Sequence, residues 1–420
     1  MFTIFRTLLL ACIVLLATSC SKQNSQLPEQ ATPLKEVADI YPDYRDNIAP
    51  LDFMVKNEAD EAMAHLVGGG KELIAEADEN GTFRLDSLAW RDLLTAARGA
   101  QVEVTLYVKR KGDWHTLTPF HITVAQEPID RYLSYRLIEP SYELYRQLGL
   151  YQRDLEGFGV TTIYENNREY SQDDNHCINC HNYQNYSTER MLFHVRAKHG
   201  GTVFVENGKP RKLNMKSDSI LSSTVYPTWH PDRNWVVFSS NQTGQVFHMK
   251  DPQKIEVVDY GSDLVFYDAD RNELRNILKT EADLETFPCW APDGRRVFYC
   301  SAHVPEFVGK TAEQRQDIIG NIHNKVRYNL MSLPFDPATG KFGAPVVEMD
   351  CAAEGKSCAV PRISPDGRYC LFTLADFGQF HIWHTSSDLY VKDLVTGTIT
   401  ALAETNSPNV DSYHTWSSNG

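Results

Sequence analysis

The sequence lacks any dense cluster of Lys and Arg, because its 41 basic residues are outnumbered by 55 acidic ones and the net charge is −14. An acidic chain without a basic cluster repels phosphate backbones, which argues against nucleic-acid binding. After the first twenty residues the sequence also lacks any run of 18 apolar residues, so no transmembrane helix is expected. It contains no Gly-x-Ser-x-Gly elbow, no Walker motif and no His-Glu-x-x-His helix, so neither a hydrolase nor a nucleotide enzyme is indicated.

The composition is that of a globular protein with much β structure. Hydrophobic residues make up 42% and charged residues 23% of the 420 positions, so two or three folded domains are expected. The chain has 20 Tyr, 19 Phe, 24 Gly and 20 Pro, a composition that favours short strands and tight turns over long helices.

The first twenty residues read as a targeting segment. Leu8–Ala17 is apolar but too short to span a bilayer, and it ends in Leu16-Ala17-Thr18-Ser19-Cys20, which resembles a bacterial lipobox. That resemblance implies a signal peptide over 1–19, a lipid on Cys20 and a polar tether over 20–36. Since no acid follows Cys20, we expect a lipid-anchored protein of the outer membrane that faces the periplasm; the alternative is an ordinary secretory peptide.

Residues 37–127 show the alternation of half-buried strands. Val102–Val108 alternates with period two, and Ile48–Val55 reads as a further strand. Ser87 is placed to cap a short helix over Leu88–Ala97. We therefore predict a small β-sandwich of immunoglobulin-like shape over 37–127.

The clearest chemical motif is Cys177-Ile178-Asn179-Cys180-His181, within a region that we assign to residues 128–200 and expect to contain short helices. Two thiols at this spacing form thioether bonds to the two vinyl groups of one haem c, and the adjacent His181 becomes the proximal iron ligand. A thioredoxin-type pair would need a βαβ unit and a zinc site would need a second ligand pair, and neither is found in the sequence. A plain disulfide over two residues would leave His181 unexplained.

Several side chains are candidates for the distal iron ligand. His194 is the first choice and Met191 the second, because both follow the motif closely, while His230 is a third possibility. His176 and His199 also lie near the motif in sequence. A Met ligand would raise the reduction potential relative to a second His, and an open position would permit peroxide chemistry. For each single His, a role in the surface or the core is the alternative.

Residues 201–420 contain a repeat. Tyr226–Ser240, Phe287–Ser301 and Val360–Leu374 align with one another around a turn of the type Pro-Asp-Gly, and a fourth copy begins at Ser412. A second hairpin follows each copy, so each unit supplies the four strands of one propeller blade. We expect a β-propeller over 201–420 whose last blade is incomplete in this sequence.

These units resemble the TolB-type β-propeller repeat, Pro-x-Trp-Ser-Pro-Asp-Gly-x-x-Ile-Ala-Phe-x-Ser. The first copy departs from it at Arg233, where the family has Gly, and the third at Ile363, where the family has Trp. The resemblance covers about half of the chain and implies a fold rather than an activity.

The remaining cysteines allow disulfides in an exported protein. Cys289 and Cys300 flank a turn and are candidates to face each other across a hairpin, and Cys351 and Cys358 are candidates to close a small loop. Cys370 is left over, and the sequence alone does not fix the pairing.

Taken together, the lipobox, the single haem motif and the repeats make the chain similar to the TolB-like, haem-motif lipoproteins of Bacteroidota-type bacteria. The resemblance implies a membrane-anchored monohaem cytochrome in which haem at Cys177, Cys180 and His181 exchanges electrons with a periplasmic redox partner. Two alternatives remain open: a propeller scaffold that binds a protein or a glycan around a structural haem, and a peroxidase-like haem enzyme.

Overall fold

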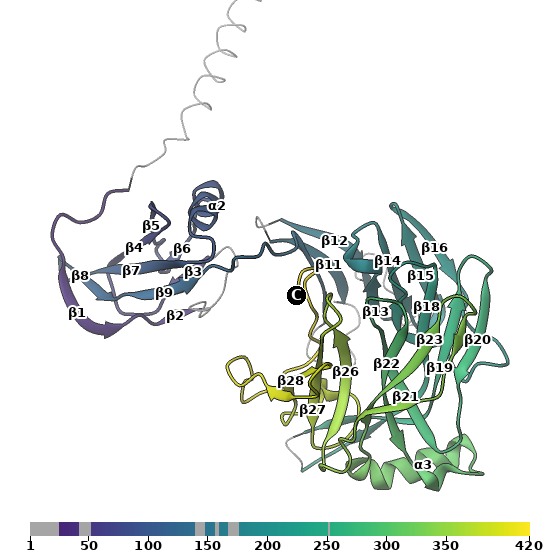
Figure 1. Cartoon of the computed structure of the whole chain (residues 1–420). Coiled ribbons are helices and arrows are strands. Elements are labelled where there is room, and N and C mark those ends of the chain that lie inside the picture. The colour runs from purple at the N-terminus through teal and green to yellow at the C-terminus, as the bar shows by residue number, and fades with distance from the viewer. Residues whose placement is uncertain (1–24, 42–51, 139–147, 156–158, 167–175, 251–252) are drawn as a thin grey trace, which may run out of the picture. The chain divides into compact units, whose positions relative to one another are not determined.

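The computed structural model describes residues 25–41, 52–138, 148–155, 159–166, 176–250 and 253–420 (Figure 1). The predicted signal peptide and Cys20 lie outside these residues. The chain divides into two compact units, the first formed by residues 1–131 with 154–159 and the second by 132–153 with 160–420. Within the described ranges, no helix is long and apolar enough to cross a membrane.

Unit 1 is built on a six-stranded sheet with the strand order β1-β8-β7-β4-β5, in which β9 also pairs with β7. Its strands are β1 (Thr32–Val37), β4 (Glu61–Gly68), β5 (Lys71–Glu76), β7 (Gln101–Arg110), β8 (Asp113–Thr118) and β9 (Phe120–Thr123). A second, three-stranded sheet holds β2 (Ile40–Tyr41), β3 (Phe53–Val55) and β6 (Thr82–Phe83). The alternation read from β7 is confirmed, because Val102, Val104, Leu106 and Val108 are all buried in one hydrophobic core.

Two details of unit 1 differ from the sequence prediction. The helix α2 spans Ser87–Ala96, and its N-cap is Asp86 rather than Ser87, because the Asp86 carboxylate accepts hydrogen bonds from the N–H groups of Leu88 and Ala89. The strand expected from residue 48 begins at Phe53, and residues 48–51 lie outside the described residues. The unit is mainly β as expected, and its immunoglobulin-like character stays a prediction.

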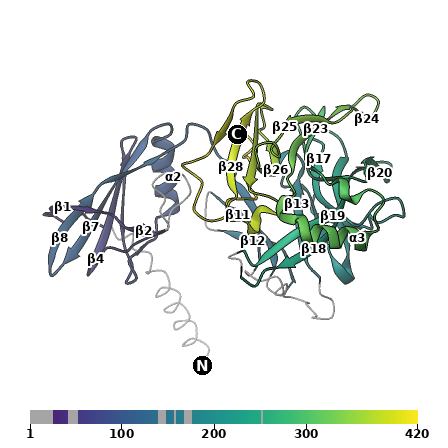
Figure 2. The same ribbon diagram turned by 90° about the horizontal axis from the view of Figure 1, so that it is seen from below.

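Unit 2 consists of successive antiparallel sheets, which we call blades 1 to 5 (Figures 1 and 2). Blade 1 holds β10 (Tyr132–Leu137), β11 (Gly149–Asp154) and β12 (Val160–Glu165), and blade 2 holds β13 (Ile178–Tyr183), β14 (Arg190–Val195), β15 (Gly201–Glu206) and β16 (Lys209–Leu213). Blade 3 holds β17 (Thr224–Trp229), β18 (Trp235–Phe247), β19 (Ile255–Asp268) and β20 (Glu273–Leu278). Blade 4 holds β21 (Asp283–Trp290), β22 (Arg296–His303), β23 (Asn329–Asp336), β24 (Lys341–Phe342) and β25 (Val346–Met349), and blade 5 holds β26 (Ser357–Ile363), β27 (Tyr369–Ala375), β28 (Asp388–Asp393) and β29 (Ile399–Ala401).

The blades are arranged as in a β-propeller. Within blades 2, 3 and 5 the strand order equals the sequence order, and the first strands of blades 2 to 5 contact one another in succession. These first strands, β13, β17, β21 and β26, therefore line the centre of the propeller. The helix α3 (Ala312–Ile322) lies in the connection between β22 and β23, with a capping box at Thr311 and Gln314.

The propeller begins earlier in the chain than the repeats suggest. The region 128–200, which we expected to be a haem-binding segment with short helices before the propeller, supplies blade 1 and the first half of blade 2. Its helical content within the described residues is limited to single turns such as Gln184–Tyr186 and Ala197–His199. Within this region, Tyr132–Leu137 forms strand β10.

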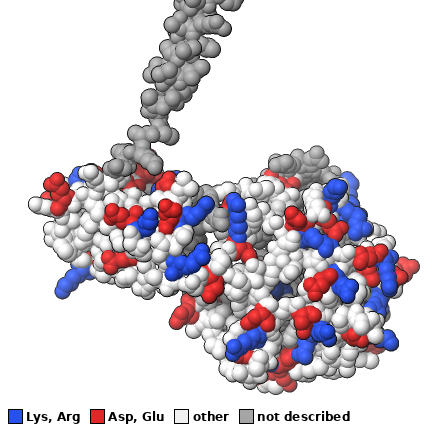
Figure 3. All heavy atoms as spheres, turned by 45° about the horizontal axis from the view of Figure 1, so that its top comes forward, with Lys and Arg blue, Asp and Glu red and all other residues white. Residues whose placement is uncertain are grey.

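The charges on the surface are mixed. Figure 3 shows Lys and Arg side chains interspersed with Asp and Glu on the face in view, without a large field of one sign.

Candidate functional site

The haem motif lies on the innermost strand of blade 2. Cys177 immediately precedes β13, and Cys180 and His181 lie within that strand. Between Asn179 and Asn182 the pairing with β14 contains a β-bulge, and Cys180 takes a left-handed backbone conformation with φ 58°. A bulge adds one residue to a strand and redirects the neighbouring side chains.

Cys180 occupies a position that recurs in every later blade. Tyr226, Phe287 and Val360 also have positive φ, at 47°, 53° and 52°, and each lies at a bulge in the first strand of its blade. A positive φ is unusual for residues with a Cβ, so this recurrence identifies one structural position repeated around the centre of the propeller. The motif therefore replaces the inner-strand residues of an ordinary blade, which the sequence alignment did not reveal.

Both thiols of the motif are protonated at neutral pH. Burial raises the pKa of Cys177 and of Cys180 above the ordinary value, against the opposite effect of the nearby charges of Arg196 and Arg136. Cys177 is 8% exposed and packs in a hydrophobic cluster with Leu148 and Met191. Because a reactive redox pair or a zinc site requires thiolates, this environment favours neither.

His181 is held in its neutral form. Burial lowers the pKa of His181 to about 4, although a hydrogen bond to the backbone of Ser134 acts in the opposite direction. The ring lies edge-on to Tyr183 at 6.4 Å between centroids, and the Tyr183 hydroxyl lies 2.6 Å from the Ser134 hydroxyl. A neutral imidazole is the form that binds a haem iron.

Three arginines, Arg136, Arg196 and Arg362, place positive charge beside the motif. Arg136 donates a hydrogen bond to the Ile178 carbonyl at 3.2 Å, and Arg362 donates one to the Pro361 carbonyl at 2.9 Å. Both guanidinium groups help to lower the pKa of His181. Neither charge is balanced by a carboxylate within the part of the chain that the structure describes.

The structure separates the two favoured distal candidates. Met191 and Phe193 lie in the hydrophobic cluster that contains Cys177, whereas Leu192 packs in the cluster shared with blade 3. Since side chains alternate along β14, His194 lies on the face of Leu192 and points away from the cluster of Cys177. His194 lines a cavity beside blade 3, so of the two candidates only Met191 shares the surroundings of Cys177.

The other histidines of the sequence prediction have different neighbours. His230 lies between blades 3 and 4, where its Nε2 is 3.2 Å from the Gly294 carbonyl oxygen and its ring is edge-on to Trp290 at 4.8 Å. His176 and His199 pack edge-on against each other with ring centroids 5.2 Å apart. These contacts give each ring a packing role.

The residues present fit a c-type haem in their chemistry. Two protonated thiols, one neutral imidazole and two guanidinium groups without carboxylate partners match the vinyl groups, the iron and the carboxylates of haem c. In a regular strand the side chains of Cys177 and Cys180, three positions apart, would point to opposite faces of the sheet. The left-handed backbone of Cys180 interrupts this alternation. Among the described residues, no group of three or more His, Cys, Asp or Glu side chains is arranged to hold a bare metal ion.

The arginines are the part of the site that sequence reasoning missed. Arg136 and Arg362 are single residues without a motif around them. The alignment of the repeats contained one usable signal. It places Arg362 on an inner strand, at the position that Thr228 and Cys289 occupy in blades 3 and 4.

The remaining cysteines are free thiols in this structure. The prediction that Cys289 faces Cys300 is wrong, because the bulge in β21 pairs Cys289 with Phe298 and Cys300 with Thr286. The Cys300 thiol instead lies 3.8 Å from the Cys358 thiol, and Cys358 is also hydrogen-bonded to Cys351.

No protein family model and no curated protein matches the sequence. Solved β-propellers are similar in structure. The β-propeller domain of the Trilobed protease from Pyrococcus furiosus is 12% identical over 85% of this chain and 84% of that chain, with a TM-score of 0.35. The Cps50 (Swd1) propeller of Myceliophteria thermophila is 9% identical over 82% and 86%, with a TM-score of 0.35, and the Dos1 propeller is 11% identical over 81% and 69%, with a TM-score of 0.32.

Proposed function

We propose that the chain is a β-propeller scaffold that carries one covalent haem c and uses it to transfer electrons to or from a partner protein. The observation that supports this proposal is the position of Cys180, which replaces the recurrent bulge residue of a blade at the centre of the propeller. When bound, the haem iron would supply a one-electron redox couple.

Each residue of the motif has a role in this proposal. Cys177 and Cys180 would hold the porphyrin through thioether bonds, and His181 would bind the iron on the proximal side. Arg136 and Arg362 would pair with the haem carboxylates, since guanidinium groups bind carboxylates in bidentate pairs; here Arg136 donates to the Ile178 carbonyl, and Arg362 donates to the Pro361 carbonyl and contacts the Cys289 thiol. Met191 is the preferred distal ligand, because it shares the hydrophobic cluster of Cys177.

The double variant Cys177→Ala/Cys180→Ala tests the role of the motif. Expressed together with a c-type haem maturation system, it is expected to lose the haem stain that the unchanged chain shows after denaturing electrophoresis. Cys289→Ala is the matched control, because Cys289 is also a buried thiol of an inner strand but lies outside the motif. Equal staining of the double variant would contradict covalent attachment at these residues.

A second candidate function is a binding scaffold in which haem is structural or absent. The propeller itself favours this candidate, since propellers commonly present loops for recognition of other molecules. Unchanged partner binding by the double variant, with electron transfer lost, would support the electron-transfer proposal. Complete function without haem would support the scaffold.

We also propose that the chain is lipid-anchored at Cys20 and faces the periplasm. Metabolic labelling with a palmitate analogue is expected to mark the protein, and Cys20→Ala is expected to abolish the label. Labelling of that variant would contradict the anchor.

A further inference from the structure

A cavity of about 510 Å³ lies between blades 2 and 3, on the face of β14 that carries His194. It is bordered by the connection after β14 and by the segment that leads into β17. Its size is within the range of about 300–1,000 Å³ typical of small-molecule sites. None of the motif residues Cys177, Cys180 and His181 is among its described lining residues, but the cavity adjoins them: the Arg196 N–H donates to the Cys177 carbonyl at 2.8 Å, and the backbone of Tyr226 is hydrogen-bonded to the Cys180 thiol.

The charged side chains among the described lining residues of the cavity are all basic. Arg196, Lys198 and Lys216 line it, and no Asp or Glu is among its described lining residues. This is a local exception in a chain whose net charge is −14. The positive field also acts on His194, whose pKa falls to about 4 through burial and, to a smaller extent, through Arg196 and Lys216. A cavity with this potential attracts an anionic group.

The same cavity contains hydrogen-bonding atoms without partners. Thr224 is fully buried, and its hydroxyl has no partner in the described part of the chain. Asn241 is 8% exposed, and its amide nitrogen donates to the Asp259 carboxylate at 2.9 Å, which leaves its carbonyl oxygen without a donor there. Buried polar atoms are normally satisfied, so these two indicate a ligand that brings hydroxyl groups.

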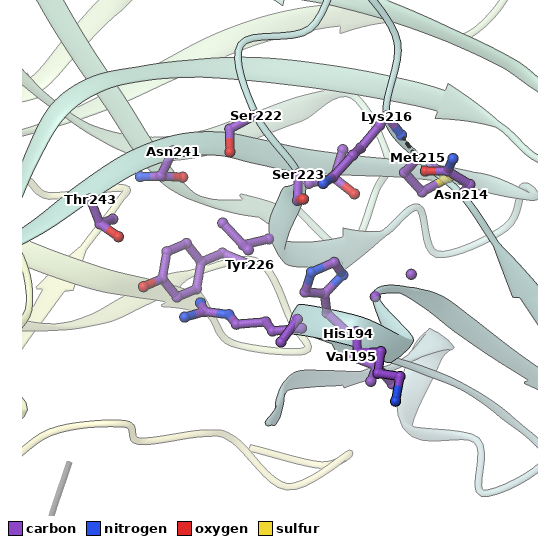
Figure 4. Close-up of a pocket in the computed structure, with 17 residues that line it drawn as sticks. His194, Val195, Asn214, Met215, Lys216, Ser222, Ser223, Tyr226, Asn241 and Thr243 are labelled. Carbon is purple, nitrogen blue, oxygen red and sulfur yellow. Dashed lines mark hydrogen bonds between the residues drawn. The ribbon is translucent and has the colours of Figure 1, made fainter. Parts of the chain in front are cut away.

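An aromatic ring completes the lining. Figure 4 shows the rings of Tyr226 and His194 on one side of the space and the side chains of Ser222 and Asn241 on the other. The ring of Tyr226 is held by contact with Phe287, with centroids 4.4 Å apart. A flat ring beside hydroxyl and amide groups is the type of surface on which a sugar ring packs.

We propose that this cavity binds an anionic monosaccharide unit, with the carboxylate or phosphate group of the sugar near Lys216 and Arg196 and its ring hydroxyls on Thr224 and Asn241. A carboxylated sugar and a phosphorylated sugar share this chemistry. The site goes beyond the proposed redox function, since none of its described lining residues belongs to the haem motif and sugar binding is measured separately from haem content.

Isothermal titration calorimetry on the whole chain tests the proposal with four probes: galacturonate, galactose 6-phosphate, neutral galactose and inorganic phosphate. At least one of the two sugar anions is expected to bind at least tenfold more tightly than both galactose and inorganic phosphate. The sugar anion that binds more tightly identifies the charged group. Equal binding of galactose would contradict the role of charge, equal binding of inorganic phosphate would contradict recognition of the ring, and absence of binding by all four would overturn the proposal.

Variants locate the binding. Lys216→Gln is expected to weaken binding of the preferred sugar anion about five- to tenfold, and Thr224→Val is expected to weaken it by a similar factor. Lys216 is exposed, so its substitution leaves the core intact. Lys209→Gln is the matched control, because Lys209 is an exposed lysine of β16 that does not line the cavity. Unchanged binding in both Lys216→Gln and Thr224→Val would show that the sugar binds elsewhere. Haem content, measured on the same samples, reports separately on the redox proposal.

Discussion

The carboxyl group of Glu285 makes the stability of the propeller depend on pH in a direction that can be calculated. Glu285 lies on β21 and is 1% exposed, one of its oxygens has no partner in the described residues, and the other accepts a hydrogen bond from Thr280 at 3.3 Å. Burial, with further contributions from the charges of Asp263 and Asp283, raises the pKa of Glu285 from 4.5 to about 9. The native carboxyl is therefore protonated at neutral pH.

The sign of the effect follows from proton binding. Between pH 4.5 and about 9 the native state holds one proton more on Glu285 than the unfolded state, so the free energy of unfolding falls as pH rises through this window. Each pH unit corresponds to about 1.4 kcal/mol. From pH 5.5 to pH 8.0, Glu285 is therefore expected to lower the free energy of unfolding by about 3 kcal/mol.

The variant Glu285→Gln removes the titrating group and keeps its size. Urea unfolding followed by tryptophan fluorescence should show that the variant gains about 3 kcal/mol over the unchanged chain between pH 5.5 and pH 8.0. Burying an amide in place of the carboxyl group changes the free energy of unfolding by the same amount at both pH values, so this change cancels from the difference. Glu273→Gln, at an exposed carboxylate of β20, should show no such gain. If Glu285→Gln and the unchanged chain differ in free energy of unfolding by the same amount at both pH values, Glu285 does not have a raised pKa in the native state.

Two further predictions concern packing and a buried polar contact. His384→Leu should destabilise the propeller by about 1–3 kcal/mol in urea unfolding, because it removes the imidazole whose Nε2 lies 2.9 Å from the fully buried Glu256 carboxylate and leaves that carboxylate with fewer polar neighbours. Adding Glu256→Leu should recover most of that loss, and equal instability of the double variant would contradict a polar contact between the two side chains. Gly294→Ala should lower the melting temperature more than Gly397→Ala: both glycines have positive φ, but a Cβ on Gly294 would lie 2.4 Å from His230 Nε2, whereas Gly397 has open space. Equal melting temperatures for the two variants would show that the contact with His230 relaxes without cost.

The repeats in the second half of the chain predicted the propeller correctly. The aligned segments that begin at Tyr226, Phe287 and Val360 coincide with the first hairpins of blades 3, 4 and 5. This part was predictable because the same turn sequence, with glycine at positive φ in blades 4 and 5, recurs between apolar strands that are buried over most of their length, and the recurrence is visible in the sequence. Gly294 and Gly367 are the turn residues in blades 4 and 5.

The first two blades were not predicted, for a physical reason. In blade 2 the turn between the first two strands is formed by Gln184–Tyr186 and the residues after it, so the Pro-Asp-Gly signal is absent. The haem motif occupies the inner strand where the repeat would otherwise be recognised. Sequence spacing alone does not show that Arg136 and Arg362 lie beside the motif, or that Met191 and His194 point to opposite faces of β14. Both features depend on how neighbouring blades pack.

A pyridine haemochrome assay of the chain, produced with a c-type maturation system, decides whether the protein carries covalent haem. We expect one covalent haem per chain, with a c-type reduced spectrum. Absence of covalent haem, while a known cytochrome matures in the same cells, would contradict it, and the chain would then be a propeller scaffold whose inner-strand cysteines serve another purpose.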